Sequence, residues 1–263
     1  MMAVAARKGR LDVKALLNFF QVRKKPNGGF GAIPRLPATI EDTYYSLRSL
    51  KLLERAGCYQ VPNDFFTGHH QFLSDKLKEG WAGTRRLFHL LRLLKDADGD
   101  KLFVKADGLI RKNLSKNPDL EQAFYVFRIG MEIGQDEKIF QNLSFREYSV
   151  RTVRDLRMFL YLKRGQINRV QREKWKDWVI ACQNGDGGFG FMPGTTAYME
   201  NCYYALRCLE ILNCKPSSPD SLVAFILSSK GKSGGFGRKN LGVPFTSSTW
   251  HALASLFLVE FNL

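Results

Sequence analysis

The sequence lacks the features that mark several common protein classes. No apolar run approaches the roughly 18 residues of a membrane-spanning helix, and no apolar segment follows the basic stretch near the start. We therefore expect neither a transmembrane segment nor a secretory signal. Five cysteines in a chain of 263 residues are an odd number, which favours free thiols in a reducing compartment over a disulfide framework. The expected location is the cytoplasm.

Acidic residues are few relative to basic ones. The chain has 40 Lys and Arg residues against 25 Asp and Glu, which gives a net charge of +15 at pH 7. A charge of this size predicts attraction to a diphosphate, to an acidic protein or to an anionic membrane surface, where the protein would bind peripherally. The basic residues are spread along the chain without a Lys/Arg-rich run, so no nucleic-acid partner is expected.

What the sequence does have is a repeat. The segment Gly-Gly-Phe-Gly occurs at residues 28–31, 187–190 and 234–237, and each copy precedes a loop and a strongly apolar helical pattern. This apolar helical pattern occurs six times along the chain. The equivalent residue of each copy, which we call its anchor, is Leu47, Phe88, Val126, Leu156, Leu206 or Leu253. A more amphipathic candidate helix precedes each copy of this pattern, at 12–24, 62–77, 100–114, 135–146, 167–182 and 217–229.

These paired helices predict an all-α fold, because no convincing strand pattern accompanies them. Helical hairpins repeated at roughly 30 to 50 residues are typical of a stacked array. Six hairpins can close into an α6–α6 toroid, a single domain over residues 1–263 with the apolar helices inside. Both terminal hairpins are as apolar as the middle ones, which favours the closed ring over the alternative, an open solenoid with polar ends.

Two segments carry a family resemblance. The residues from Gln183 read Q-N-G-D-G-G-F-G, and those from Cys202 read C-Y-Y-A-L. This pattern resembles the repeat of protein prenyltransferase β subunits and is similar to that of squalene cyclases and class II terpene cyclases. The resemblance implies a toroid whose aromatic cavity takes an isoprenoid diphosphate or another prenyl lipid. For the prenyltransferases it also implies a helical-repeat α subunit as partner.

The prenyltransferase resemblance implies a zinc site, built from Asp-x-Cys in one repeat and His in the next. The first element falls on Glu200, Asn201 and Cys202, and the His position falls on Ser248, with His251 one turn later. Glu200, Cys202 and His251 are the candidate ligands of a zinc ion that would keep an acceptor thiol deprotonated. The alternative is that Cys202 is a buried small side chain, because most equivalent positions carry threonine.

The cyclase resemblance implies a different chemistry at the first repeat. Cyclases carry Asp-x-Asp-Asp-Thr, and the sequence from Thr39 reads T-I-E-D-T. Glu41 and Asp42 are therefore candidates for the general acid that would protonate an alkene or epoxide. The alternative is ordinary helix capping, since Asp, Glu, Ser and Thr at helix starts commonly have that role.

Candidate ligand-binding residues come from equivalent positions of the six inner helices, matched by their anchors. The starts of the inner helices would face one end of the ring, where exposed N–H groups favour an anion. The resemblance gives Tyr203 a diphosphate-binding role. Equivalent positions add the arginines Arg85, Arg86, Arg151 and Arg154, and the aromatic residues Tyr44, Tyr45, Tyr204 and Trp250 as cavity lining. The alternatives are that the arginines are solvated or paired with Glu121 and Asp155, and that the aromatic residues belong to the core.

Three functions stay open on this evidence. The expected one is a prenyltransferase β-like protein that binds an isoprenoid diphosphate and transfers the prenyl group to an acceptor. A cyclase-like domain and a non-catalytic toroid that binds a lipid or a protein are the alternatives.

Overall fold

The computed structural model describes residues 11–57, 59–65, 68–79, 83–98, 118–132, 134, 149–163 and 165–261. Within these ranges all regular secondary structure is helical. The only β-bridges there are isolated ones at the Gly-Gly-Phe turns. The all-α prediction is confirmed. In the same ranges no helix combines the length and the apolar character needed to cross a membrane.

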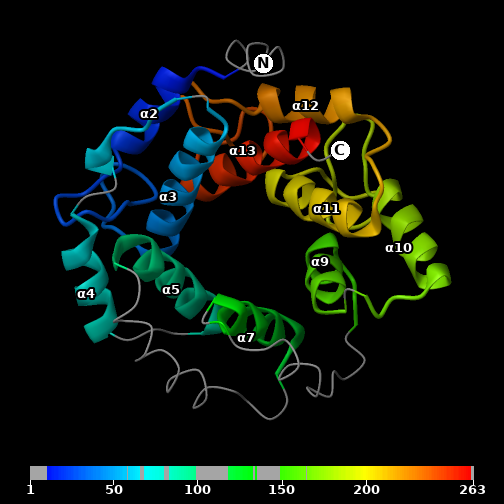
Figure 1. The fold of residues 1–263 in the computed structure, drawn as a ribbon. Coiled ribbons are helices and arrows are strands. Elements are labelled where there is room, and N and C mark those ends of the chain that lie inside the picture. The colour runs from blue at the N-terminus through cyan, green and yellow to red at the C-terminus, as the bar shows by residue number, and fades with distance from the viewer. Residues whose placement is uncertain are drawn as a thin grey trace.

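Six helices form the inner layer, and each contains one of the six buried anchor residues. They are α3 (Ile40–Arg55), α5 (Thr84–Asp98), α7 (Leu120–Glu132), α9 (Val153–Leu162), α11 (Met199–Leu212) and α13 (Thr246–Phe261). Each packs against the next in chain order, and α13 packs against α3 (Figure 1). The inner helices therefore close into a ring, which confirms the toroid over the open solenoid.

The outer helices lie outside this ring (Figure 1). They are α2 (Val13–Gln21), α4 (His69–Glu79), α10 (Arg169–Ala181) and α12 (Pro219–Ser228), with a short 3-10 turn, η1 (Asn63–Phe65), before α4. Pro219 occupies the first turn of α12, where its missing N–H costs no hydrogen bond. The outer helices predicted at 100–114 and 135–146 lie outside the described residues, so the count of six hairpins stays a prediction.

The Gly-Gly-Phe repeat joins neighbouring hairpins through close backbone contacts. Gly187 has a φ of 88°, and a Cβ added there would lie 2.2 Å from the carbonyl oxygen of Ser221 in α12. Gly234 is equivalent, with a φ of 89° and a Cβ position 2.3 Å from the carbonyl oxygen of Ala15 in α2. Only glycine fits such a position. The last copy of the repeat thus meets the first hairpin.

The phenylalanine of each repeat ties its loop to the inner helix that follows. All three are fully buried, and each backbone N–H donates a hydrogen bond to a side chain near the start of that helix. The bonds run from Phe30 to Thr43 Oγ1 (2.9 Å), from Phe189 to Cys202 Sγ (3.3 Å) and from Phe236 to Thr249 Oγ1 (2.9 Å). Threonine and cysteine therefore have the same structural role here.

Candidate ligand-binding site

Three cavities lie in succession from one end of the ring toward the other, and neighbouring cavities share lining residues. The first, which we call the mouth cavity, has a volume of about 500 Å³. Its walls are the starts of α3, α5, α9, α11 and α13 and parts of the loops before α11 and α13. It lies where the sequence predicted an anion site, at the N-terminal ends of the inner helices.

The arginines of the mouth cavity are paired with carboxylates. The pairs are Arg85–Glu41 (2.6 Å), Arg154–Glu121 and Arg238–Glu200. Arg85 also donates a hydrogen bond to the hydroxyl of Tyr45 at 2.9 Å. These carboxylates neutralise the charge that the arginines of the mouth cavity would otherwise offer to an anion.

The second cavity, the waist, is a constriction of about 70 Å³ at the middle of the ring. Aromatic side chains make most of its wall, including Tyr44, which stacks on His89 with ring centroids 4.0 Å apart. Three arginines also line it: Arg48, Arg128 and Arg157. Among the described residues that line the waist there is no carboxylate.

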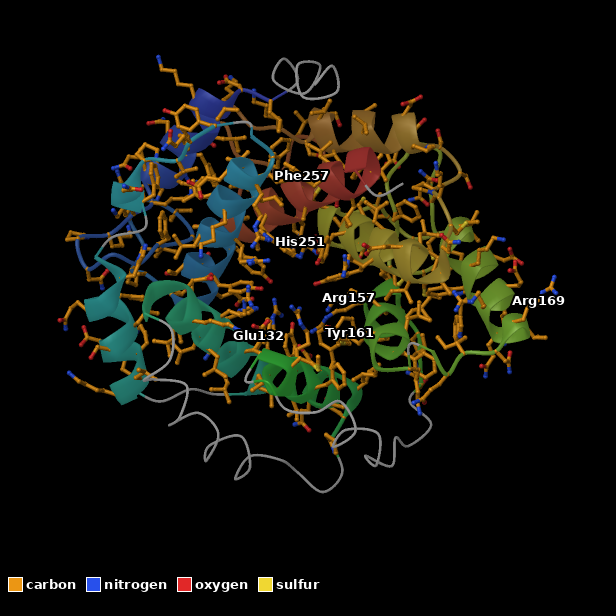
Figure 2. The ribbon with its side chains drawn as sticks, in the orientation of Figure 1. Glu132, Arg157, Tyr161, Arg169, His251 and Phe257 are labelled. Carbon is orange, nitrogen blue, oxygen red and sulfur yellow. The ribbon has the colours of Figure 1, made fainter. Side chains whose placement is uncertain are left out.

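The waist arginines are held by aromatic rings. The guanidinium of Arg157 lies 4.6 Å from the ring centre of Phe124, and that of Arg128 lies 4.3 Å from the ring centre of Phe88. Arg157 is only 9% exposed, and Figure 2 shows it beside the central space, across from His251. The buried Nε atoms of Arg48 and Arg157 have no hydrogen-bond partner within the described chain. Cation–π contacts offset only part of the cost of burying these charges.

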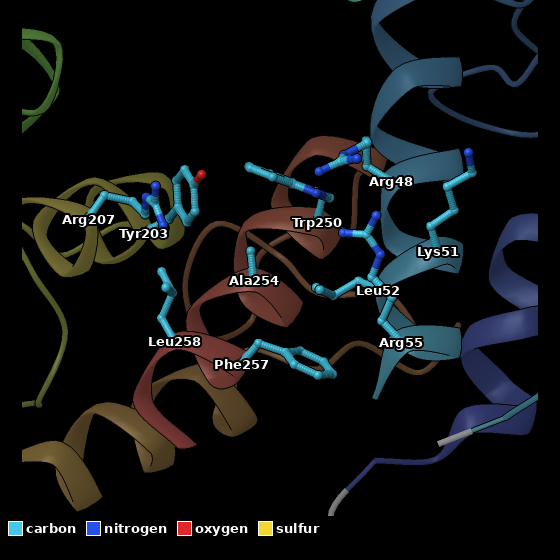
Figure 3. Close-up of a pocket in the computed structure, with 10 residues that line it drawn as sticks. All are labelled: Arg48, Lys51, Leu52, Arg55, Tyr203, Arg207, Trp250, Ala254, Phe257 and Leu258. Atoms are coloured by element: carbon cyan, nitrogen blue, oxygen red, sulfur yellow. The ribbon is translucent and has the colours of Figure 1, made fainter. Parts of the chain in front are cut away.

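The third cavity, the far cavity, has a volume of about 420 Å³ and lies along the second halves of α3, α11 and α13 (Figure 3). Leu52, Ala254, Phe257 and Leu258 give it an apolar wall. Its cations are Arg48, Lys51, Arg55 and Arg207, of which Lys51 pairs with Asp96 (2.8 Å) and Arg207 with Glu210 (2.5 Å). Arg48, Tyr203 and Trp250 line both the waist and the far cavity, so the two are continuous.

Both histidines of the waist are held in the neutral form. Burial lowers the pKa of His251 to about 3, and the nearby charges of Arg157 and Arg85 act in the same direction. Burial, with Arg85 and Arg128, lowers the pKa of His89 well below its usual value. The positive charge at the waist is therefore that of its arginines.

The predicted binding residues divide into two groups. All five aromatic candidates line the waist: Tyr44, Tyr45, Tyr203, Tyr204 and Trp250. Of the four arginines, Arg85 and Arg154 line the mouth cavity as paired ions. Arg86 and Arg151 are exposed and line none of the three cavities.

The acid motif does not have the geometry of a general acid. Asp42 lines none of the cavities; its carboxylate accepts hydrogen bonds from the hydroxyls of Thr39 and Thr246, both at 2.6 Å. Thr39 in turn caps α3 by accepting from the Asp42 N–H at 3.0 Å. Glu41 does line the mouth cavity, but its carboxylate is already held in the ion pair with Arg85 at 2.6 Å. Helix capping, the alternative interpretation, fits the structure.

The proposed zinc ligands do not fit zinc either. No three His, Cys, Asp or Glu residues of the described chain are arranged to hold a metal ion. Cys202 is fully buried and lines none of the three cavities. Its Sγ accepts the Phe189 N–H, and Glu200 pairs with Arg238. The burial of Cys202 and its contact with the Phe189 N–H fit the alternative interpretation, a buried small side chain.

The waist arginines were not among the predicted residues, although the sequence holds a signal for them. Arg48, Arg157 and Arg207 each directly follow an anchor residue, and His89 follows the anchor of α5. Four of the six positions that follow an anchor are therefore basic, whereas α7 and α13 have Phe127 and Ala254 there, and Arg128 lies outside this pattern.

Comparison with known proteins agrees with this architecture. A family model described as prenyltransferase alpha-alpha toroid domain matches residues 2–81 and 113–262. No curated protein matches the chain. The matched residues include most of the described inner helices and all three copies of Gly-Gly-Phe.

Proposed function

The chain belongs to the prenyltransferase alpha-alpha toroid family, and from this premise we propose that it binds an isoprenoid diphosphate inside its ring. The diphosphate lies at the junction of the waist and the far cavity, beside Arg48, Arg128 and Arg157. The prenyl chain extends along the apolar wall of the far cavity.

One observation carries this proposal: three arginines line the waist with no carboxylate among its described lining residues. A buried cation without an anionic partner is costly, and a bound anion removes that cost. Guanidinium groups also match phosphate oxygens in geometry, because they donate two parallel hydrogen bonds. The arginines of the mouth cavity, in contrast, already have carboxylate partners.

The far cavity supports the apolar half of the ligand. Its volume of about 420 Å³ falls in the ordinary range of ligand pockets, roughly 300–1,000 Å³. Leu52, Phe257 and Leu258 provide apolar contact for a hydrocarbon chain, and Trp250 reaches from this wall to the waist. An amphipathic ligand with an anionic head fits this order of charged and apolar lining.

Transfer of the prenyl group to an acceptor stays a prediction from the family resemblance, as do the helical-repeat partner subunit and the cytoplasmic location. No three metal-binding side chains of the described residues come together, and the mouth carboxylates have other partners: Glu41 and Glu200 pair with arginines, and Asp155 accepts backbone N–H groups at the start of α9. Binding is therefore the function that the geometry supports best.

The test compares ligands that separate the head from the chain. Farnesyl diphosphate, farnesol and inorganic diphosphate would be titrated into the protein by calorimetry. We expect farnesyl diphosphate to bind more tightly than either part. Arg157→Met should weaken farnesyl diphosphate about 10- to 100-fold, because a charged hydrogen bond contributes roughly 1.5–3 kcal/mol. It should leave the affinity for farnesol nearly unchanged.

Arg86→Met is the matched control, since Arg86 is an exposed arginine of α5 outside all three cavities. It should bind all three ligands as the wild type does. Equal affinity for farnesyl diphosphate and farnesol would refute the proposal, and so would an Arg157→Met protein that retains wild-type affinity for the diphosphate.

A further inference from the structure

Exposed apolar side chains gather in three equivalent loops. Six of the ten exposed large hydrophobic residues of the described chain lie there: Leu36, Phe191, Met192, Leu241, Val243 and Phe245. The loops cover residues 32–39, 191–198 and 238–245, and each connects a Gly-Gly-Phe-Gly turn to the next inner helix. An exposed cluster of this kind, unlike scattered single residues, indicates an interaction surface.

The loops lie at the end of the ring that holds the mouth cavity. The Phe191 carbonyl accepts the backbone N–H of Val153 at the start of α9 (2.8 Å), and the Arg238 carbonyl accepts that of Met199 at the start of α11 (2.7 Å). Phe191 and Phe245 line the mouth cavity itself. The third loop, 32–39, leads into the start of α3 in the same way. We call the surface of these three loops the mouth face.

The three loops of the mouth face carry charge of one sign, and the carboxylates Glu41, Glu121 and Glu200 at the same end of the ring are each paired with an arginine. Residues 32–39, 191–198 and 238–245 contain no Asp or Glu, and they contain three exposed basic residues, Arg35, Arg238 and Lys239. Arg238 has a carboxylate partner in Glu200 on α11. The chain as a whole carries a net charge of +15. This surface is complementary to an anionic one.

Leu241 is the most exposed apolar residue of the mouth face. It is 97% exposed and adopts a φ of 60°, a left-handed conformation that side chains other than Gly and Asn rarely take. Packing within the chain gives no reason for a leucine at this position. Asparagine would suit the backbone better and would be more soluble.

We propose that the mouth face docks on an anionic membrane surface. Leu241, Val243 and Leu36 enter the boundary between headgroups and acyl chains, and Arg35 and Lys239 contact anionic headgroups. The inference does not depend on the proposed ligand.

The test is co-sedimentation of the full chain with vesicles of phosphatidylcholine alone and with 30% phosphatidylglycerol. We expect binding to the anionic vesicles, weakened by salt, and little binding to the neutral ones. Leu241→Asn with Val243→Thr should reduce the partition coefficient about tenfold, because two apolar side chains no longer enter the boundary. Lys239→Gln should reduce it about fivefold on anionic vesicles only.

Val170→Thr is the matched control, because Val170 is 79% exposed on the outer helix α10, away from the mouth face. It should bind vesicles as the wild type does. The Leu241→Asn/Val243→Thr protein should keep its unfolding midpoint, so lost binding would not reflect lost folding. A wild type that binds neither kind of vesicle overturns the proposal and leaves the mouth face to a protein partner. Equal losses in the control and in the double variant also overturn it.

Discussion

Replacement of Cys202 by threonine or by valine distinguishes the two interpretations of this residue, a metal ligand or a buried hydrogen-bond acceptor. Thr43 and Thr249 occupy the equivalent positions of two other repeats, and each accepts the buried phenylalanine N–H through Oγ1 at 2.9 Å. Threonine at position 202 can accept the Phe189 N–H in the same way. Valine has nearly the same shape but no acceptor, so the pair tests whether the Phe189 N–H needs one.

The expected difference follows from the burial of Phe189 and Cys202, both fully inaccessible to water. In Cys202→Val the Phe189 N–H has no acceptor and no access to water, which costs about 1–3 kcal/mol. Any strain from the added methyl group is common to both variants and cancels in the comparison. We therefore expect Cys202→Thr to exceed Cys202→Val in unfolding free energy by about 1–3 kcal/mol.

Urea denaturation followed by circular dichroism measures this difference, provided that the two variants share the same denaturant dependence. Affinity for farnesyl diphosphate should be the same in Cys202→Thr and the wild type, because Cys202 lies outside the cavities. Equal midpoints for the two variants would refute the hydrogen-bond role. Loss of ligand affinity or of bound metal in Cys202→Thr would restore the ligand interpretation.

Two further predictions concern the joints and the waist. Gly187→Ala should lower the unfolding free energy about 1–3 kcal/mol more than Gly194→Ala in urea denaturation, because both have positive φ but only the first Cβ meets backbone, at Ser221. Equal losses of unfolding free energy in the two variants would contradict the close contact between Gly187 and α12. His251 has a folded pKa of about 3 against roughly 6.5 unfolded, so between these values acid favours the unfolded state. Wild-type stability should therefore fall relative to His251→Phe by about 1.4 kcal/mol per pH unit below pH 6, and a constant difference would exclude this linkage.

The ring was predictable from the sequence because its determinants are periodic and local. The anchor residues repeat with the apolar pattern of a buried helix, and the Gly-Gly-Phe turns mark the joints. The apolar terminal hairpins predicted closure, and the packing of α13 against α3 confirms it. The contact of Gly234 with Ala15 of α2 joins residues far apart in the chain, and no pattern within either segment indicates that particular contact.

The site was less predictable than the fold. Comparison of the repeats shows which positions are equivalent, but it does not show which partner each charged side chain contacts. Arg85 and Arg154 matched the expected columns, yet each meets a carboxylate of the neighbouring inner helix. Cys202 matched a zinc motif, yet its Sγ faces the Phe189 N–H. Pairing of this kind depends on contacts between repeats, which the sequence of one repeat does not contain.

The arrangement of these pairs gives a physical reason for a binding site deeper than the helix starts. Arg85–Glu41 joins α5 to α3, Arg154–Glu121 joins α9 to α7, and Arg238–Glu200 joins the loop before α13 to α11. Half-exposed pairs of this kind stabilise the ring only modestly. They nevertheless oppose an anion at the mouth, because it would have to displace a carboxylate from each arginine. At the waist no carboxylate among the described lining residues has to be displaced. The interaction energy of an anion with the waist arginines is therefore available for binding.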